Sequence, residues 1–290
     1  MKKITIGCIG LGLMGKPVAI NLIKAGYKVS VYSRREESSK PLAELGCQVY
    51  DSPKALAQHC QVLITNVSDS SDVEAVLLGE NGAIEGLKAG SIVLDMSTIS
   101  PDITRRIASE LNQRDIEMLD APVSGGPQGA ESALLSIMVG GKKEVFESAL
   151  PILQCVGKNI VHIGDNGAGQ VAKACNQLIV AQTMTAISEA FVLAKASNVD
   201  PSKVRDALMG GFAGSRILEV HGQRMLSGDY TPGFKSKLHQ KDLNIIMQEA
   251  DKLGLKLEST KLSQLYMNSI KNGELDSSAI YSEIEKDNLS

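Results

Sequence analysis

The chain has 290 residues and a mass of 30.8 kDa, which is enough for two domains of ordinary size. Apolar residues make up 43% and charged residues 22%, values typical of globular proteins, and these values exclude a disordered chain. No uninterrupted apolar run reaches the roughly 18 residues of a membrane span, so no membrane partner is expected. Thirty Lys and Arg stand against 33 Asp and Glu, and this net charge of −3 argues against nucleic acid as a partner.

The first half of the chain has the pattern of an α/β domain. From about residue 4 to residue 164, short β-branched runs alternate with amphipathic stretches, which predicts a parallel sheet covered by helices. Ser52-Pro53 and Ser100-Pro101 each place a capping hydroxyl before a proline at a first helical position. Strands are expected at 4–9, 28–32, 62–66, 92–95, 116–119, 135–139 and 160–163.

The second half has a helical pattern. A long apolar run without strand punctuation predicts one helix over about 168–196, which at 1.5 Å per residue extends roughly 40 Å. A helix of this length is expected to join two domains or two subunits. Domains are therefore predicted at 1–164 and 165–290, with further helices at 201–208, 239–253 and 262–271.

A glycine turn follows the first predicted strand. The segment from Gly10 to Gly15 reads G-x-G-x-x-G and opens a predicted helix, a context that indicates a dinucleotide-binding turn over a plain glycine turn. In this reading Gly10, Leu11, Gly12, Leu13, Met14 and Gly15 hold a pyrophosphate at a helix N-terminus. The residues 10–16 also match G-x-x-x-x-G-K, but Pro17 offers no hydroxyl for magnesium, which disfavours a nucleoside triphosphate.

The end of the second predicted strand bears on the choice of cofactor. Ser33, Arg34 and Arg35 stand where NAD-binding proteins carry an acidic residue for the ribose hydroxyls. Two guanidiniums and no carboxylate favour a 2′-phosphate, so NADP is the expected cofactor, with NAD as the alternative. A solvated pair of surface arginines is the competing interpretation.

Two further stretches carry candidate chemistry. Lys173 lies about one turn inside the long helix, with Asn176 and Gln177 near the same face, and an ammonium facing a cleft can donate a proton to a carbonyl oxygen. A solvated or ion-paired lysine is the alternative. Ser124, Gly125 and Gly126 follow a predicted strand and offer a hydroxyl and backbone amides to a small carboxylate, although a tight Gly-Pro turn explains them equally well.

Metal chemistry is not expected. The four histidines show no ligand spacing, and the five cysteines are scattered without a C-x-x-C pair. The cysteine pattern fits a reduced cytoplasm.

Together these residues resemble the β-hydroxyacid dehydrogenase family, which includes 3-hydroxyisobutyrate dehydrogenases. Four blocks carry the resemblance, in family order and over nearly the whole chain: Gly10–Gly15 with Asn21-Leu22, Asp120–Gly126, Gly167–Lys173 with Asn176, and Lys241-Asp242-Leu243. The resemblance implies a Rossmann-type, doubly wound N-terminal domain and an all-helical C-terminal domain that completes the cleft. It also implies a homodimer or homotetramer acting on a small molecule.

The resemblance assigns roles to individual residues. It implies Lys173 as the catalytic acid/base with Asn176 beside it, and Ser124, Gly125 and Gly126 as ligands of the substrate carboxylate. Many members have Asn at the position of Gln177, whereas members that reduce tartronate semialdehyde to glycerate have Gln there, as this chain does. Gln177 is expected among the substrate-binding residues. The resemblance places Thr98, Phe234 and Lys241 at the cofactor.

The resemblance therefore implies the NAD(P)H-dependent reduction of small semialdehydes that carry a carboxylate, with Lys173 as general acid. Tartronate semialdehyde, reduced to glycerate, is the favoured substrate. A 3-hydroxyisobutyrate dehydrogenase and a succinic or glyoxylate semialdehyde reductase are alternatives within the family. A non-catalytic dinucleotide-binding scaffold is the alternative of a different class, because some chromatin-associated relatives lack the catalytic lysine. The presence of Lys173 favours an enzyme.

Overall fold

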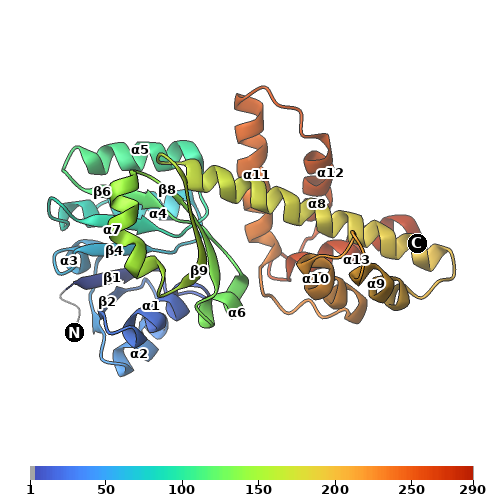
Figure 1. Cartoon of the computed structure of the whole chain (residues 1–290), viewed down its shortest axis with the longest axis horizontal. Coiled ribbons are helices and arrows are strands. Elements are labelled where there is room, and N and C mark those ends of the chain that lie inside the picture. The colour runs from blue at the N-terminus through green and yellow to red at the C-terminus, as the bar shows by residue number, and fades with distance from the viewer. Residues whose placement is uncertain (1–3, 290) are drawn as a thin grey trace. The chain divides into compact units, whose positions relative to one another are not determined.

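The computed structural model describes residues 4–289, which divide into two compact units (Figure 1). The first unit ends at Lys173 and the second begins at Ala174, while the expected domain ends at residues 1 and 290 lie outside the described residues. The expected border at 164/165 differs from the observed division by nine residues. The reason is that the first turn of the long helix is hydrogen-bonded to strand ends of the first unit, as described below.

The first unit is built on one sheet. Within the described residues the sheet has nine strands in the order β3-β2-β1-β4-β5-β6-β8-β7, with β9 paired to β8. The strands β1, β2, β4, β5 and β6 run parallel to one another, as predicted. The strands are β1 (Thr5–Ile9), β2 (Lys28–Tyr32), β3 (Gln48–Val49), β4 (Val62–Thr65), β5 (Ile92–Asp95), β6 (Glu117–Asp120), β7 (Val123–Ser124), β8 (Leu135–Gly140) and β9 (Gly157–Gly164).

One part of the sheet differs from the prediction. The strand β8 runs antiparallel to both β6 and β7, so the sheet is mixed. A parallel crossover needs a dozen or more residues, and the link from Ser124 to Leu135 is shorter than that, which suits an antiparallel return. Two-residue strands such as β3 and β7 leave no periodic pattern in the sequence, and neither was predicted.

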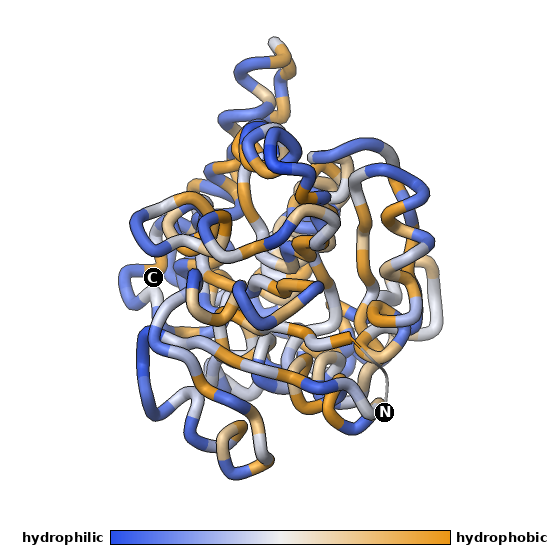
Figure 2. Tube along the Cα trace, turned by 90° about the vertical axis from the view of Figure 1, so that its left-hand side faces the viewer, coloured by the Kyte–Doolittle hydropathy of each residue, from blue (hydrophilic) through white to orange (hydrophobic). Residues whose placement is uncertain are grey.

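Helices cover both faces of this sheet and enclose two apolar cores. One core joins the strands to α1, α2, α6 and α7, and the other joins them to α3, α4 and α5. Figure 2 shows hydrophobic and hydrophilic residues alternating in short stretches along the trace, as expected of elements with one buried face. The helices are α1 (Gly15–Lys24), α2 (Glu36–Glu44), α3 (Pro53–Ala57), α4 (Ser70–Leu78), η1 (Ala83–Glu85), α5 (Pro101–Asn112), α6 (Gly126–Glu131) and α7 (Lys143–Leu153).

The two predicted serine caps have different outcomes. Ser52 caps α3 as predicted, because its hydroxyl accepts a hydrogen bond from the Ala55 amide at 3.1 Å. The prediction for Ser100 was wrong, since its side chain makes no capping hydrogen bond in the described structure. Its own amide instead donates to the Ser70 hydroxyl at 3.2 Å, which ties the start of α5 to α4.

The second unit is helical, as predicted. Its core gathers apolar side chains of α8, α10, α11, α12 and α13, with Phe191 fully buried and packed edge-to-face on Tyr281 at 6.1 Å. The helices α10, η2 and α13 were not predicted. The helix α10 begins after the capping Ser215 and is followed by Gly228 in the left-handed region. The helices are α8 (Ala168–Ala196), α9 (Pro201–Met209), α10 (Arg216–Ser227), α11 (Ser236–Lys252), α12 (Glu258–Ser269), η2 (Ser277–Ala279) and α13 (Ile280–Leu289).

The helix α8 is, by length and composition, apolar enough to cross a membrane. Half of its most apolar window is buried inside the protein, and the core helix of a globular protein meets the same criteria.

Candidate active site

The turn after β1 has the geometry that a dinucleotide requires. Gly10 has a φ of 88°, and a Cβ there would lie 2.1 Å from the Asn66 carbonyl oxygen. A Cβ on Gly15 would lie 1.9 Å from the Gly10 carbonyl oxygen, so both positions exclude a side chain. At Gly12, in contrast, a Cβ would meet nothing within 4 Å, which leaves open space beside the backbone.

The start of α1 supplies the chemistry for an anion. The N-cap residue Met14 makes no side-chain cap, and the first turn carries no acidic residue. The Lys16 and Val18 amides already donate to the Gly12 and Met14 carbonyls, at 3.1 and 3.3 Å, and Pro17 has no N–H. The positive end of the helix dipole is therefore what favours an anion at this helix start. The residues present therefore fit the pyrophosphate of a nicotinamide dinucleotide.

The end of β2 presents two exposed arginines. Arg34 lies in the loop before α2, and its Nη1 is 3.1 Å from Oδ1 of Asp72 on α4, while 71% of its side chain stays exposed. Arg35 is the exposed N-cap residue of α2, and its amide donates to the Ser33 hydroxyl at 3.3 Å. Ser33 itself is half-buried at the strand tip. The loop thus offers cations at the position predicted for a 2′-phosphate, with Asp72 engaging one of them.

The predicted carboxylate loop lies between β7 and α6. Ser124 is half-buried, whereas Gly125 and Gly126 are exposed with φ values of 138° and 63°. The helix α6, which follows the loop, is tied to α1, because the side-chain amide of Asn21 donates to the Ala130 carbonyl at 2.7 Å. This tether makes α1 support both the phosphate turn and the carboxylate loop.

The helix that carries Lys173 begins on a buried carboxylate. Asp120, at the end of β6, accepts hydrogen bonds from the amides of Gly167 at 2.8 Å and Gln170 at 3.0 Å. Burial raises the pKa of Asp120, and these backbone amides counteract the rise. A Cβ on Gly169 would lie 2.4 Å from the Met138 carbonyl oxygen, so the helix start needs a glycine here to pack against the sheet. Asp120 is an anchor that the sequence did not reveal, because its partners are 47 and 50 residues away.

Lys173 is buried, with 7% of its surface exposed, in the second turn of α8. Gln177, four residues later, is also buried, and Asn176 is half-buried beside it. The structure therefore brings the predicted proton donor and its two polar neighbours onto adjoining positions of one helix. A solvated lysine, the alternative interpretation, does not fit this degree of burial.

In the second unit, a chain of polar contacts starts at Asn176. Its side-chain amide donates to Oε1 of Gln177 at 2.8 Å, and Nε2 of Gln177 donates to Oδ2 of Asp242 at 2.7 Å. Lys241 Nζ lies 3.0 Å from the other oxygen of Asp242. Asp242 thus links two of the predicted site residues, Gln177 and Lys241, although the sequence had marked it only as part of a family block.

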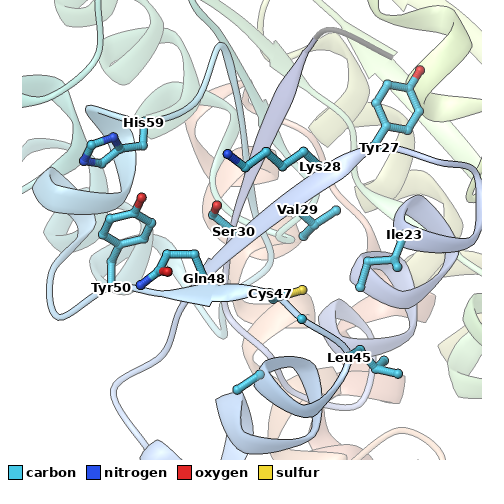
Figure 3. A pocket seen from close by; sticks show the side chains of 12 residues that line it. Ile23, Tyr27, Lys28, Val29, Ser30, Leu45, Cys47, Gln48, Tyr50 and His59 are labelled. Atoms are coloured by element: carbon cyan, nitrogen blue, oxygen red, sulfur yellow. The ribbon is translucent and has the colours of Figure 1, made fainter. Parts of the chain in front are cut away.

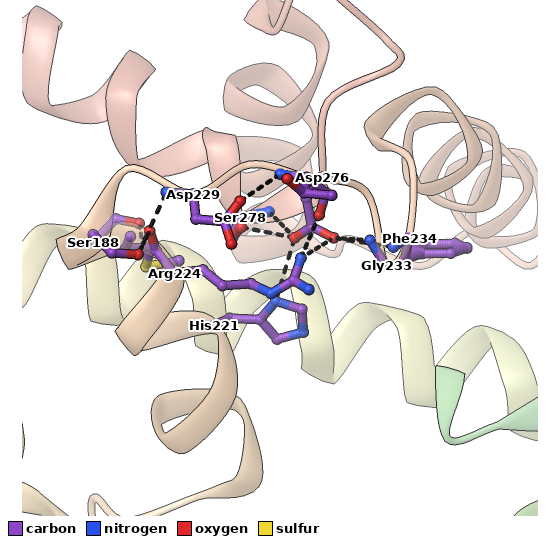
Figure 4. A network of polar contacts seen from close by, with 11 residues as sticks. Ser188, His221, Arg224, Asp229, Gly233, Phe234, Asp276 and Ser278 are labelled. Atoms are coloured by element: carbon purple, nitrogen blue, oxygen red, sulfur yellow. Dashed lines mark hydrogen bonds and ion pairs between the residues drawn. The ribbon is translucent and has the colours of Figure 1, made fainter. Parts of the chain in front are cut away.

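A second network holds the segment before α11 (Figure 4). The buried Asp276 accepts hydrogen bonds from the amides of Gly233 at 2.9 Å and Phe234 at 3.0 Å, and Arg224 Nη1 lies 3.0 Å from the same oxygen. Burial would raise the pKa of Asp276, but hydrogen bonds from His221, Phe234 and neighbouring groups hold it well below its usual range. The network fixes Phe234, a predicted cofactor residue.

A cavity of about 620 Å³ lies elsewhere in the first unit (Figure 3). It is lined by the start of β2, by β3 and by Tyr50 and His59, whose rings stack 5.0 Å apart. None of the predicted site residues lines it. Among residues 4–289 the structure also shows no cluster of three or more His, Cys, Asp or Glu side chains arranged to hold a metal.

Comparisons with known proteins identify the family of this chain. The NAD-binding domain model of 6-phosphogluconate dehydrogenase matches residues 5–164, and the NAD-binding model of NADP-dependent 3-hydroxyisobutyrate dehydrogenase matches residues 167–284. The chain is 45% identical over 283 residues to 2-hydroxy-3-oxopropionate reductase of Escherichia coli, covering 97% of both chains. It is 35% identical over 263 residues to 2-(hydroxymethyl)glutarate dehydrogenase of Eubacterium barkeri, covering 90% of this chain and 87% of the relative.

A solved structure gives the same result. The 3-hydroxyisobutyrate dehydrogenase of Mycobacterium tuberculosis with L-serine superposes with a TM-score of 0.88 and 28% identity, over 97% of this chain and 99% of that one. The fold and the matches therefore define an NAD(P)-dependent oxidoreductase that acts on the CH–OH group of 3-hydroxy acids. The chain belongs to the family of 3-hydroxyacid dehydrogenases that includes 3-hydroxyisobutyrate dehydrogenase. The predicted α/β fold, family and enzyme class are confirmed.

Proposed function

We propose that this protein uses NADPH to reduce small semialdehydes that carry a carboxylate, with tartronate semialdehyde as substrate and glycerate as product. The observation that carries the proposal is the buried Lys173 on a helix anchored by Asp120, the residue from which the Ser124 loop departs. The end of β6 thus anchors the helix that carries the proton donor and also leads into the carboxylate loop. The 45% identity to a 2-hydroxy-3-oxopropionate reductase supports this choice of substrate.

In the proposed mechanism the chain supplies the proton and the orientation. When bound, the reduced nicotinamide supplies a hydride to the carbonyl carbon. The Lys173 ammonium donates its proton to the carbonyl oxygen, which becomes the hydroxyl of the product, and neutral Lys173 regains a proton from water. Ser124 Oγ and the amides of Gly125 and Gly126 hold the substrate carboxylate, while Asn176 and Gln177 supply polar contacts to the substrate.

For the cofactor, we propose that residues 10–15 hold the pyrophosphate and that Ser33, Arg34 and Arg35 hold the 2′-phosphate. Thr98, Phe234 and Lys241 are proposed to contact the cofactor from their own units. Arg34→Asp tests the preference, because it replaces a phosphate donor by a carboxylate that repels phosphate and can bind ribose hydroxyls. We expect kcat/KM for NADPH to fall at least about tenfold more than that for NADH.

Arg216→Asp is the matched control for this variant, because Arg216 is an exposed arginine of the second unit that also pairs with a carboxylate. It should leave both cofactors unaffected. An equal fall in kcat/KM for NADPH and NADH in Arg34→Asp would show that Arg34 does not bind the 2′-phosphate.

The substrate is tested by following NADPH oxidation at 340 nm with a series of aldehydes. Tartronate semialdehyde and glyceraldehyde have the same number of carbons, but only the first carries a carboxylate. We expect tartronate semialdehyde to be reduced at least about 100-fold more efficiently, with succinic semialdehyde and glyoxylate in between. Equal use of glyceraldehyde would overturn the carboxylate requirement, and a preference for oxidising 3-hydroxyisobutyrate would identify the alternative substrate within the family.

We further propose a cytoplasmic location and a homodimer or homotetramer. Large apolar side chains exposed on the second unit support self-association, among them Ile179 and Leu193 of α8 and Leu265 of α12. Light scattering coupled to size-exclusion chromatography measures the mass in solution, and a value near 30.8 kDa would contradict the oligomer.

A further inference from the structure

Gln170 makes three hydrogen bonds within the first unit. Its side chain is 1% exposed, in the first turn of α8. Its Oε1 accepts from the Ile99 amide at 3.1 Å, and its Nε2 donates to the Ser97 carbonyl at 2.8 Å. Its own amide donates to Asp120 at 3.0 Å. One buried amide side chain therefore ties the helix start to the segment that follows β5.

The two side-chain bonds lie on either side of Thr98. Ser97 is held further, because its amide donates to Asp95 at 3.1 Å and its hydroxyl accepts from the Val67 amide at 2.9 Å. Ser97 and Ile99 are both buried, whereas Thr98 between them is half-buried. The backbone is thus fixed on both sides of the residue that is proposed to contact the cofactor.

The same helix turn leads to the proposed proton donor. Lys173 is three residues after Gln170, so the two side chains are neighbours on the surface of α8. We propose that Gln170 is a positioning residue, which sets Thr98 relative to Lys173 and so aligns the hydride donor with the proton donor. This inference rests on the proposed function, in which Thr98 contacts the cofactor and Lys173 protonates the substrate. Hydride transfer is sensitive to misplacements of about 1 Å, and rates can fall about 100-fold in such cases.

Gln170→Met is the first test, because Met keeps the length and the apolar bulk of the side chain and removes both hydrogen bonds. We expect kcat to fall about 10- to 100-fold while the Kd for NADPH changes less than about threefold. With NADPH deuterated at the transferred position, the isotope effect on kcat should rise, because hydride transfer becomes rate-limiting. Unchanged kcat and isotope effect in a folded variant would overturn the proposal.

Ser52→Ala is the matched control, since it removes one hydrogen bond at the start of α3 in the same unit. It should lower the melting temperature without altering kcat or the isotope effect. If Gln170→Met behaved in the same way, Gln170 would be a stabilising residue only.

Gln170→Glu adds a pH readout that a merely stabilising role would not produce. A protonated Glu has the same shape as Gln and can donate to the Ser97 carbonyl, whereas an ionised Glu cannot donate and would lose this hydrogen bond. The activity of this variant relative to wild type should therefore rise as the pH falls from 8 to about 6. A constant ratio would contradict the proposal.

Hydrogen exchange separates this proposal from the proposed function. The Ile99 amide should exchange at least about tenfold faster in Gln170→Met than in wild type, whatever substrate the enzyme uses. A wild-type enzyme that does not reduce carboxylate semialdehydes would refute the proposed function alone. Unaltered exchange at Ile99 would refute the role of Gln170 alone.

Discussion

The two units hold their functional segments with buried carboxylates whose pKa values shift in opposite directions. In the first unit, burial raises the pKa of Asp95 from 3.8 to about 6 and also raises that of Asp120. In the second unit, the pKa of Asp276 is held well below its usual range, although this side chain is fully buried as well. Burial is common to all three, so the partners decide the direction.

Those partners differ in charge. Asp95 accepts from the Thr65 hydroxyl and the Ser97 amide, its second oxygen has no hydrogen-bond partner among the described residues, and the nearby Asp120 carboxylate raises its pKa further. Asp276 has Arg224 at 3.0 Å and His221 at 3.5 Å in addition to its backbone amides. Hydrogen bonds from His221, the Phe234 amide and Ser278 favour the charged form of Asp276, and the Arg224 guanidinium adds an opposite charge beside it. The comparison therefore predicts that the two units respond differently to mutation and to pH.

The largest expected effect is on turnover, and it should follow the loss of Lys173 in the first unit and not the loss of Lys241 in the second. Lys173→Ala in the first unit should lower kcat by about 10²–10⁴ while NADPH still binds, because a general acid commonly contributes that much. Lys241→Ala in the second unit should raise the KM for NADPH and leave kcat within about tenfold. Stopped-flow and steady-state kinetics measure both, and near-normal turnover in Lys173→Ala would exclude Lys173 as the acid.

Removing the second unit's carboxylate should cost stability. Asp276→Ala leaves Arg224 and the amides of Gly233 and Phe234 without their acceptor, and breaking such a buried pair typically costs about 3–5 kcal/mol. Urea unfolding followed by circular dichroism measures the loss. Glu274→Gln is the control, because Glu274 forms exposed ion pairs with Lys235 and Lys237 and its removal should have little effect.

The free energy of unfolding that Asp276 contributes should depend on pH. Because the folded pKa of Asp276 lies below its ordinary value of 3.8, its stabilisation is present above about pH 4 and disappears as the pH falls below that value. The difference between wild type and Asp276→Asn should therefore shrink on acidification. A difference that stayed constant down to pH 3 would contradict the assigned direction.

Asp95→Asn should have the opposite effect in the first unit. The folded protein holds the Asp95 proton more tightly than the unfolded chain does, so wild-type stability is lost as the pH rises from about 4 through about 6. The Asn variant avoids this loss and should be more stable than wild type at pH 7.5, by at most about 3 kcal/mol. Urea unfolding at pH 4.5 and 7.5 tests this. The exposed Asp51→Asn serves as control, and an equal difference at both pH values would refute the prediction.

The smallest effect concerns the carboxylate loop of the first unit. Ser124→Ala should raise the KM for tartronate semialdehyde about 5- to 10-fold and change kcat less than about threefold. The reason is that a carboxylate remote from the reacting carbon is held equally in the ground and transition states. Glyceraldehyde, which lacks the carboxylate, is the control substrate. A fall in kcat with unchanged KM would instead place Ser124 at the reacting carbon.

Local patterns in the sequence were sufficient for much of this protein. The glycine turn at residues 10–15, the parallel strands β1, β2, β4, β5 and β6, and the helical second half all follow from spacing along the chain. Family blocks led to the correct class of enzyme. These features depend on neighbours within one element or one turn, where backbone geometry and side-chain period leave little choice.

Other features were decided only by the tertiary structure. Ser100 has a capping sequence but no cap, and β8 runs antiparallel to β7, to which a short connection joins it. The contacts that hold the site, made by Asp120, Gln170 and Asp276, join residues 42 to 73 positions apart. A buried polar side chain must find partners wherever the fold brings donors and acceptors together, and no local pattern specifies those partners. Sequence alone therefore identified the residues proposed for the reaction, whereas the structure revealed the residues that hold them in place.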